Sequence, residues 1–193
     1  MKTRIMCVDT ETGGLDPARH ALLSFSAVDS FDGEAFTALI RPCSEWLVEK
    51  EALDVNGFTF EHLEKNGRPE REVMEDFVLW MGQRRYAVLA GCNTAFDRAF
   101  LLAAAERAGV SLPLGHRMIC LQSAAWMSYE AGGLDLPLGK DGNPKLNLNA
   151  IAGALGMSRA GKIHNCLEDA LLTLACLRRV TQTVEMAPQK EAL

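Results

Sequence analysis

Two acidic residues close an apolar segment near the start of the chain. Residues 4–9 predict a buried strand, which ends in Asp9 and Glu11 just before Gly13 and Gly14. Side chains two positions apart in a strand point to the same side, with α-carbons about 6.6 Å apart. Because a buried carboxylate costs several kcal/mol unless it is paired or binds a cation, the pair predicts a divalent metal site. The alternative is a pair of strand-end acids that face water.

A second Asp-x-Glu pair shows that this spacing alone is weak support. Asp32 and Glu34 flank Gly33 between two apolar stretches, which predicts a hairpin turn in solvent. Such pairs arise by chance in a chain with 25 acidic residues. The metal interpretation of the first pair therefore depends on acids elsewhere in the sequence.

The next candidate acid lies where a predicted strand, 86–91, turns into a predicted helix, 94–108. Asn93 or Thr94 is suited to cap this helix, and Asp97 then falls in its first turn, where the helix dipole favours negative charge. Asp97 could stabilise its own helix only, or it could join the first pair in one site.

A histidine and an acid mark the entrance to the last predicted helix, 166–183. His164 lies on the entering loop and Asp169 lies near the first turn. His164 could be a surface or capping residue. Chain order and the strand-loop-helix context nevertheless agree for all three segments, and agreement across independent levels is stronger support than any single motif.

Three short motifs carry a resemblance to a known family: Asp9-x-Glu11, Asn93-x-x-x-Asp97 and His164-x-x-x-x-Asp169. They resemble the DEDDh branch of the 3′-to-5′ exonucleases, which includes the epsilon proofreading subunit of DNA polymerase III, ribonuclease T, oligoribonuclease and exonuclease X. The resemblance covers about residues 4–183. The branch that uses tyrosine is disfavoured, because the position four residues before Asp169 holds Asn165.

Two positions depart from the family pattern. Many relatives have histidine where this chain has Cys92, and a His-Gly-Ile-like segment where this chain has Asn56-Gly57-Phe58. These differences concern recognition of the base. The five positions that carry the chemistry all match.

The resemblance implies an α/β, ribonuclease H-like mixed sheet flanked by helices in a single domain. It implies hydrolysis of phosphodiester bonds from the 3′ end of single-stranded nucleic acid, with DNA favoured and nucleoside 5′-monophosphates released. Two divalent cations are implied, and Mg²⁺ or Mn²⁺ suits carboxylate ligands better than zinc. An exoribonuclease or oligoribonuclease of RNA turnover is the closest alternative. A non-catalytic nucleic-acid binding module and an endonuclease of ribonuclease H type remain from other classes.

The resemblance also assigns roles to the acids and to the histidine. Asp9 would bridge both cations, Glu11 and Asp169 would complete the first site, and Asp97 would support the second. His164, with an ordinary pKa near 6.5, suits a general base. The metal ligands are thus expected to be Asp9, Glu11, Asp97 and Asp169.

Substrate contacts are expected around the first and second motifs. Phe58 and Phe96 could stack on bases or belong to the core, and Arg159 and Lys162 could bind phosphate or remain solvated loop cations. The remaining expected contacts are Thr10, Gly13, Gly14, Leu15 and Asn93.

Composition bounds the function. The 193 residues suit a single domain, and the net charge of −5 is unusual for a nucleic-acid binder, which ordinarily carries a basic surface. Two divalent cations would offset four of those charges. The balance favours a protein that grips a few nucleotides at an end over one that wraps long duplex DNA.

Six cysteines without a Cys-x-x-Cys pair predict reduced thiols and a cytoplasmic location. The first strand starts at once, which leaves no room for a signal peptide, and no apolar stretch reaches membrane-spanning length. The exonuclease domain is expected at 1–183 and a flexible tail at 184–193. Residues 182–186 resemble clamp-binding segments, which suggests association with a polymerase or a sliding clamp.

The periodicity of apolar residues predicts a mixed sheet with helices packed against it. The expected strands are 4–9, 21–29, 34–40, 86–91 and 116–120. The expected helices are 69–83, 94–108, 121–130, 147–156 and 166–183.

Overall fold

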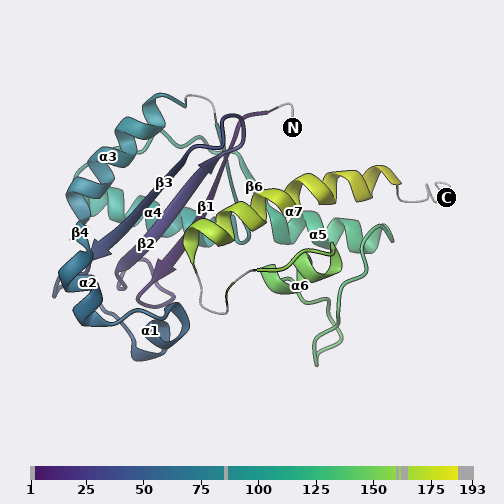
Figure 1. The fold of residues 1–193 in the computed structure, drawn as a ribbon, viewed down its shortest axis with the longest axis horizontal. Coiled ribbons are helices and arrows are strands. Elements are labelled where there is room, and N and C mark those ends of the chain that lie inside the picture. The colour runs from purple at the N-terminus through teal and green to yellow at the C-terminus, as the bar shows by residue number, and fades with distance from the viewer. Residues whose placement is uncertain (1–2, 85–86, 160, 162–164, 187–193) are drawn as a thin grey trace.

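The computed structural model describes residues 3–84, 87–159, 161 and 165–186. Within these residues, six strands form one sheet in the order β4-β3-β2-β1-β5-β6, and seven helices surround it (Figure 1). The strands are β1 (Ile5–Thr12), β2 (Leu22–Asp29), β3 (Ala35–Arg41), β4 (Arg68–Pro69), β5 (Val88–Gly91) and β6 (Met118–Cys120). The helices are α1 (Lys50–Asn56), α2 (Phe60–Asn66), α3 (Glu70–Gly82), α4 (Thr94–Ala108), α5 (Leu121–Glu130), α6 (Leu148–Ala154) and α7 (Cys166–Met186). The predicted mixed sheet flanked by helices is confirmed.

Strand β1 is central and is covered on both faces. It pairs antiparallel with β2 and parallel with β5, while β3 extends the antiparallel side and β6 the parallel side. Alternate residues of β1 enter different apolar clusters: Met6 and Val8 on one face, Ile5 and Cys7 on the other. Burial on both faces explains why the strand reads as a continuous apolar run.

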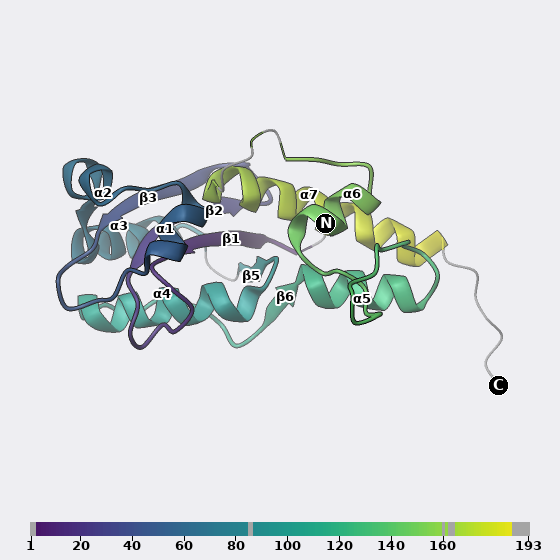
Figure 2. The same ribbon diagram turned by 90° about the horizontal axis from the view of Figure 1, so that it is seen from below.

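The helices divide between the two faces of the sheet. Helices α3 and α4 supply Phe77 and Phe100 to the first cluster, and α5, α6 and α7 supply Leu121, Ile151 and Leu174 to the second. Figure 2 shows α4 and α7 on opposite sides of β1. Both helices therefore reach the central strand, one from each face.

Three elements were not expected from the sequence: α1, α2 and β4. The two helices have seven residues each, too few to display an apolar period. Gly57 ends α1 with φ of 71°, and the side chain of Thr59 starts α2 by accepting a bond from the backbone N–H of His62. Local caps thus define helices that periodicity does not reveal.

The ends of two expected elements also differ. Strand β1 continues to Thr12, so Asp9 and Glu11 lie within the strand and do not follow it. Helix α7 continues to Met186, so the first residues of the expected tail are helical, and 187–193 lie outside the described residues. The strand is longer because β2 pairs with it as far as Thr12.

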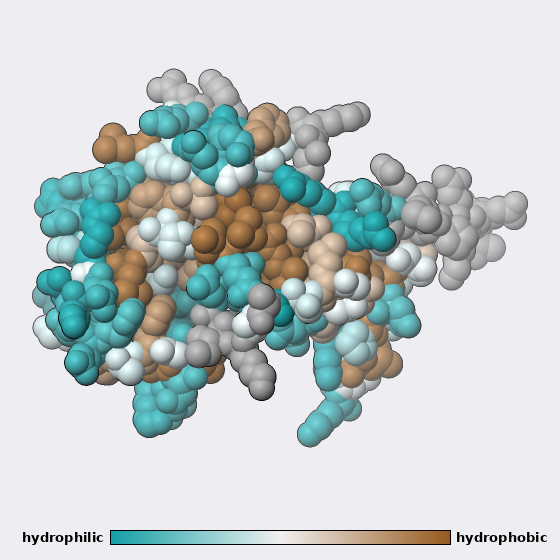
Figure 3. Space-filling model, viewed as in Figure 1, coloured by the Kyte–Doolittle hydropathy of each residue, from teal (hydrophilic) through white to brown (hydrophobic). Residues whose placement is uncertain are grey.

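On the face seen in Figure 1, apolar side chains gather over the sheet and the first turns of α7 (Figure 3). All six cysteines lie in the described part of the chain and none of them forms a disulfide. Across the described ranges, no helix combines the length and apolar character needed to cross a membrane.

Candidate active site

Strand β1 carries the first two acids toward α7. Asp9 and Glu11 follow Cys7 at intervals of two, so all three share the face that α7 covers. Asp9 is partly exposed, whereas Glu11 is only 5% exposed. Glu11 Oε1 is buried without a hydrogen-bond partner among the described residues. An orphaned carboxylate oxygen is costly to bury, so Glu11 Oε1 is a candidate ligand for a cation.

Helix α7 brings Asp169 to the same place. The side-chain oxygen of Asn165 accepts bonds from the backbone N–H groups of Leu167 and Glu168, both at 3.1 Å, and so starts the helix. The backbone N–H of Asp169 donates to the Asn165 carbonyl at 2.9 Å. The Asp169 side chain is 2% exposed, so the first turn of α7 buries an acid against the sheet.

Helix α4 supplies Asp97 from the other side of β1. Thr10 Oγ1 donates to Asp97 Oδ1 at 2.9 Å, so Asp97 is held by the central strand and is 5% exposed. Gly91 leaves room for it, because a β-carbon there would lie 3.0 Å from Asp97 Oδ2. Asn93 takes the N-cap position of α4 but forms no side-chain cap bond. Asp97 thus points into the acid cluster as well as starting its own helix.

The pKa values show that these acids act on one another. Burial raises the pKa of Glu11 to about 7, and the charge of Asp169 adds to this effect. Burial raises the pKa of Asp97 to about 7, against the lowering effect of the hydrogen bonds from Thr10. The pKa of Asp9 is raised well above its usual range by burial, then by Asp97 and Glu11. Four acids from three elements therefore form one cluster that disfavours negative charge.

The chemistry of this cluster fits a divalent cation. Carboxylate oxygens of Asp9 and Glu11 and the sulfur of Cys166 all lie within 4.8 Å of one another. Hard cations prefer carboxylate oxygens, and a bound cation would offset the repulsion between these acids. Asp9 and Glu11 belong to the ligand set expected from the sequence, whereas Cys166 does not.

Arg159 occupies a position that neither expectation described. Its Nε lies 2.8 Å from Asp169 Oδ1, and the two side chains are 7% and 2% exposed. Its positive charge also lowers the pKa of Asp9 and of Glu11. Arg159 is therefore a buried counterion of the acid cluster, and not a solvated loop cation.

Two basic residues of the prediction cannot be placed. His164, the expected general base, and Lys162 lie outside the described residues.

A cavity of about 350 Å³ lies beside the cluster, between the end of β1 and α1. Figure 2 shows α1 next to that end of the strand. Leu15 is 82% exposed, and Phe96 contacts Phe100 with ring centroids 4.9 Å apart. Four of the expected substrate residues line the cavity: Thr10, Gly14, Leu15 and Phe96.

The other expected contacts lie elsewhere. The Gly13 backbone donates to the Ala21 carbonyl at 2.8 Å and does not line the cavity. Phe58 packs in a small separate cluster and stacks on His62, with ring centroids 6.1 Å apart. Asn93 is exposed ahead of α4. Of the two phenylalanines, the structure brings only Phe96 to the cavity.

One wall of the cavity comes from α1, a helix that was not predicted. Asn56 is 5% exposed and its Nδ2 donates to the Thr12 carbonyl at 3.0 Å, which fixes α1 to the end of β1. The only hint was the Asn-Gly pair at 56–57, which is a common chain reversal. The further lining residues are Glu11, Thr12, Glu49, Glu51, Ala52, Val55 and Asn56.

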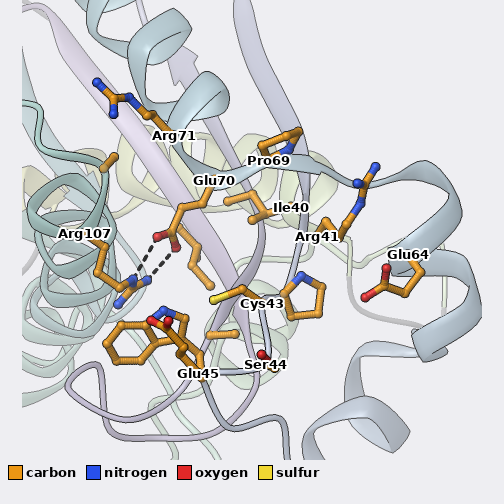
Figure 4. A pocket seen from close by; sticks show the side chains of 15 residues that line it. Ile40, Arg41, Cys43, Ser44, Glu45, Glu64, Pro69, Glu70, Arg71 and Arg107 are labelled. Atoms are coloured by element: carbon orange, nitrogen blue, oxygen red, sulfur yellow. Dashed lines mark hydrogen bonds and ion pairs between the residues drawn. The ribbon is translucent and has the colours of Figure 1, made fainter.

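A second cavity, of about 750 Å³, lies apart from the acids (Figure 4). Arg107 lies in its wall, bonded to both carboxylate oxygens of Glu70 at 2.8 and 2.6 Å. The Arg107 guanidinium also lies 4.5 Å from the ring centroid of Trp46. These paired charges join α3, α4 and the loop after β3, which is a structural role.

The sheet order, with acids on the central strand and on a helix from each face, is the ribonuclease H-like arrangement that the sequence predicts. The family model of the ribonuclease T type, described as exonuclease, matches residues 6–177. The chain belongs to this exonuclease family.

Known proteins agree with this assignment. Ribonuclease T of Marinobacter nauticus is 34% identical over 117 residues, 53% of either chain. The 3′-5′ DNA exonuclease Cap18 of Escherichia coli is 29% identical over 105 residues, 52% of this chain and 56% of that one. The chain thus spans about half the length of these curated relatives.

Among solved structures, Escherichia coli exonuclease I in complex with a dT13 oligonucleotide has a TM-score of 0.80 and 19% identity. The match covers 94% of this chain and 41% of that one. At this identity the likeness supports the fold, which is the one that the sequence predicts.

Proposed function

We propose that this protein is a metal-dependent 3′-to-5′ exonuclease that removes nucleotides from the 3′ end of single-stranded nucleic acid, with DNA preferred. The observation that carries the proposal is the convergence of four acids from β1, α4 and α7, three of them with raised pKa values. Exonucleases of this family generally use divalent metal ions. Membership of the family supplies the reaction class.

The acids have separate tasks in this proposal. Asp9, Glu11 and Asp169, whose charges act on one another, would hold one cation, and Asp9 and Asp97 would hold a second. Two ions such as Mg²⁺ or Mn²⁺ would, when bound, neutralise the phosphate charge and make water a better nucleophile. Thr10 keeps Asp97 directed at the cluster through its 2.9 Å hydrogen bond.

The histidine is proposed as the general base. His164 lies five residues before Asp169 in the sequence, a spacing that resembles the family motif. A neutral imidazole with a pKa near 6.5 can accept a proton from the attacking water at neutral pH. Its replacement by alanine would slow turnover while leaving the four acids to bind metal.

The 350 Å³ cavity is proposed to receive the terminal nucleotide. Leu15 and Phe96 offer apolar surfaces for a base. Gly14 keeps the wall thin, since a β-carbon there would lie 2.2 Å from the His20 ring. The acids lie at one end of the cavity through Glu11, so a nucleotide held there would present its phosphodiester to them.

The test is digestion of a 5′-labelled, single-stranded DNA with Mg²⁺ or Mn²⁺, resolved by length. A ladder that shortens from the 3′ end is expected, with no product in chelator and at least about a hundredfold less from Asp9→Asn. Asp32→Asn is the matched control, because this acid belongs to the other Asp-x-Glu pair and lies in an exposed turn. Cutting of a circular single strand would contradict exonuclease action.

Ribonuclease activity is the second candidate, since the 34% identical relative is a ribonuclease T. An RNA of the same sequence, offered in competition with the DNA, distinguishes the two. Faster loss of the RNA would assign the protein to RNA turnover. Two other similar proteins support the DNA preference. Cap18 is a DNA exonuclease, and the solved structure of exonuclease I contains a DNA oligonucleotide.

Partners and location stay predictions. Residues 182–186, which resemble a clamp-binding segment, continue α7 to its end. Co-purification with a polymerase or a sliding clamp would test that association. A cytoplasmic location is supported by the six free thiols.

A further inference from the structure

The acid cluster contains a thiol that hydrolysis by the four acids does not require. Cys166 is the first residue of α7 and is 4% exposed. Its sulfur lies within 4.8 Å of carboxylate oxygens of both Asp9 and Glu11. It also lies 3.6 Å from Ser24 Oγ, to which the thiol donates. The side chain therefore points from the helix into the acid cluster.

An independent observation at the same place concerns the Glu11 carboxylate. Glu11 is 5% exposed, and its Oε1 has no hydrogen-bond partner in the described part of the chain. The sulfur thus lies beside a buried carboxylate, one oxygen of which has no hydrogen-bond partner among the described residues. Two hard oxygens and one soft sulfur converge on one point.

The chemistry of this donor set differs from that of four carboxylates. Mg²⁺ prefers oxygen ligands, whereas Zn²⁺ and Cd²⁺ bind thiolate and carboxylate together. Zinc bonds of about 2.3 Å to sulfur and about 2.1 Å to oxygen place the two ligand atoms at most about 4.4 Å apart. Atoms within 4.8 Å of one another reach that spacing by small side-chain rotations.

We propose that Cys166, Asp9 and Glu11 form a site for a thiophilic divalent cation, Zn²⁺ or Cd²⁺, which displaces the hard cation and stops hydrolysis. On binding, the Cys166 thiol releases its proton to the buffer and its sulfur bonds to the cation. The inhibition rests on the proposed exonuclease function, because the two kinds of cation share Asp9 and Glu11. The binding itself does not depend on turnover.

The experiment is a Cd²⁺ titration of the intact chain, followed by the ultraviolet charge-transfer band of the cadmium–thiolate bond. We expect a saturable band that Cys166→Ala and Cys166→Ser both remove, with Cd²⁺ affinity falling at least about tenfold. Serine keeps the size and polarity of the side chain beside Ser24, which guards against loss of folding. Cys43→Ala, which removes an exposed thiol, should keep the band.

Two further measurements separate the possible failures. Asp9→Asn should weaken Cd²⁺ binding, and Zn²⁺ should inhibit the natural chain at concentrations at least about tenfold below those needed for Cys166→Ala. A band that survives Cys166→Ala, or that ignores Asp9→Asn, overturns the proposed site. Absence of Mg²⁺-dependent hydrolysis before any Zn²⁺ is added would overturn the proposed function instead. The Cd²⁺ titration would then still decide whether Cys166 binds the cation.

Discussion

Arg159 offsets part of the repulsion between the acids of the cluster in the metal-free protein. Its guanidinium pairs with Asp169 in a nearly dry environment, and it also eases the repulsion around Asp9 and Glu11. A divalent cation would do the same task with more charge. Arg159 and the cation therefore compete for the same carboxylates, so the arginine should weaken metal binding while it stabilises the metal-free protein.

Arg159→Met should lower the stability of the metal-free protein by about 3 kcal/mol, because Asp169 stays buried and loses this counterion. Divalent metal should then raise the melting temperature more than it does in the natural chain. Thermal unfolding in chelator and in Mn²⁺ measures both effects. Arg71→Met is the control, since Arg71 forms an exposed pair with Glu75 and should cost under about 1 kcal/mol. Equal metal-induced shifts in the two variants would refute the competition.

The raised pKa values predict a pH dependence. Glu11 binds its proton more tightly in the folded state, with a pKa of about 7 against 4.5 in the unfolded chain. Its contribution to stability is therefore complete below pH 4.5 and is lost as the pH rises through about 7. Melting temperatures of metal-free protein should fall across this range, and Mn²⁺ should remove much of the fall. A metal-free melting temperature that rises across the same range would contradict the burial of these acids.

The residues of the site differ in how far the sequence reveals them. Asp9, Glu11 and Asp169 follow from spacing, because strand and helix geometry is local. The Thr10–Asp97 bond and the Arg159–Asp169 pair join positions that only the fold brings together. Nothing in the local sequence distinguishes Arg159 from a solvated arginine.

The length of a helix determines whether the apolar period of its sequence can predict it. Helices α3, α4 and α7 have 13, 15 and 21 residues and were predicted to within a few residues at each end. Helices α1 and α2 have seven residues and exist because caps and neighbouring strands hold them. One wall of the cavity beside the acids is built from α1, so a substrate site cannot be drawn from periodicity alone.

Gly14, in the loop between β1 and β2, lines the cavity beside the acids. A β-carbon at Gly14 would lie 2.2 Å from the His20 ring, which is 5% exposed and bonded to Glu49 at 3.0 Å. Gly14→Ala should therefore displace His20 and deform the cavity. We expect KM for oligonucleotide to rise at least about tenfold, with a smaller change in kcat.

The matched control for this variant is Gly153→Ala in α6, where a β-carbon meets nothing within 4 Å. That change should stabilise the helix by up to about 1 kcal/mol without altering KM. An unchanged KM for Gly14→Ala, measured beside this control, would remove the cavity from substrate binding.

Across the whole molecule, a buried group of ion pairs lies near the start of β1, and the acid cluster lies near its end. Asp29 pairs with Met6 near the start of β1, whereas Asp9 pairs with Ser26 farther along. Asp29 is 1% exposed, accepts a bond from Arg4 at 2.7 Å, and lies 3.1 Å from Arg84 Nε. Burial acts to raise the pKa of Asp29, but the hydrogen bonds from Arg4 and the Phe31 backbone and the charges of Arg4 and Arg84 together outweigh it, so this pKa is lowered.

Asp29→Asn should cost about 3 kcal/mol of folding free energy, because two arginines lose their buried carboxylate. The lowered pKa means that the contribution of Asp29 is present above its unfolded pKa and is lost as the pH falls. Denaturant unfolding measures the loss. Hydrolysis per folded molecule should stay within about twofold of the natural chain; a larger change would mean that the two ends of β1 are coupled.

The net charge of the whole molecule bears on cation binding by the acid cluster. A net charge of −5 opposes nucleic-acid binding, and cations in the acid cluster would offset part of it. Calorimetric titration of Mn²⁺ into the metal-free chain is therefore the most direct measurement. We predict saturable binding that Asp9→Asn weakens at least about tenfold, while Asp32→Asn leaves it unchanged. Absence of binding, or equal binding by the Asp9→Asn chain, would contradict a metal centre at the junction of β1, α4 and α7.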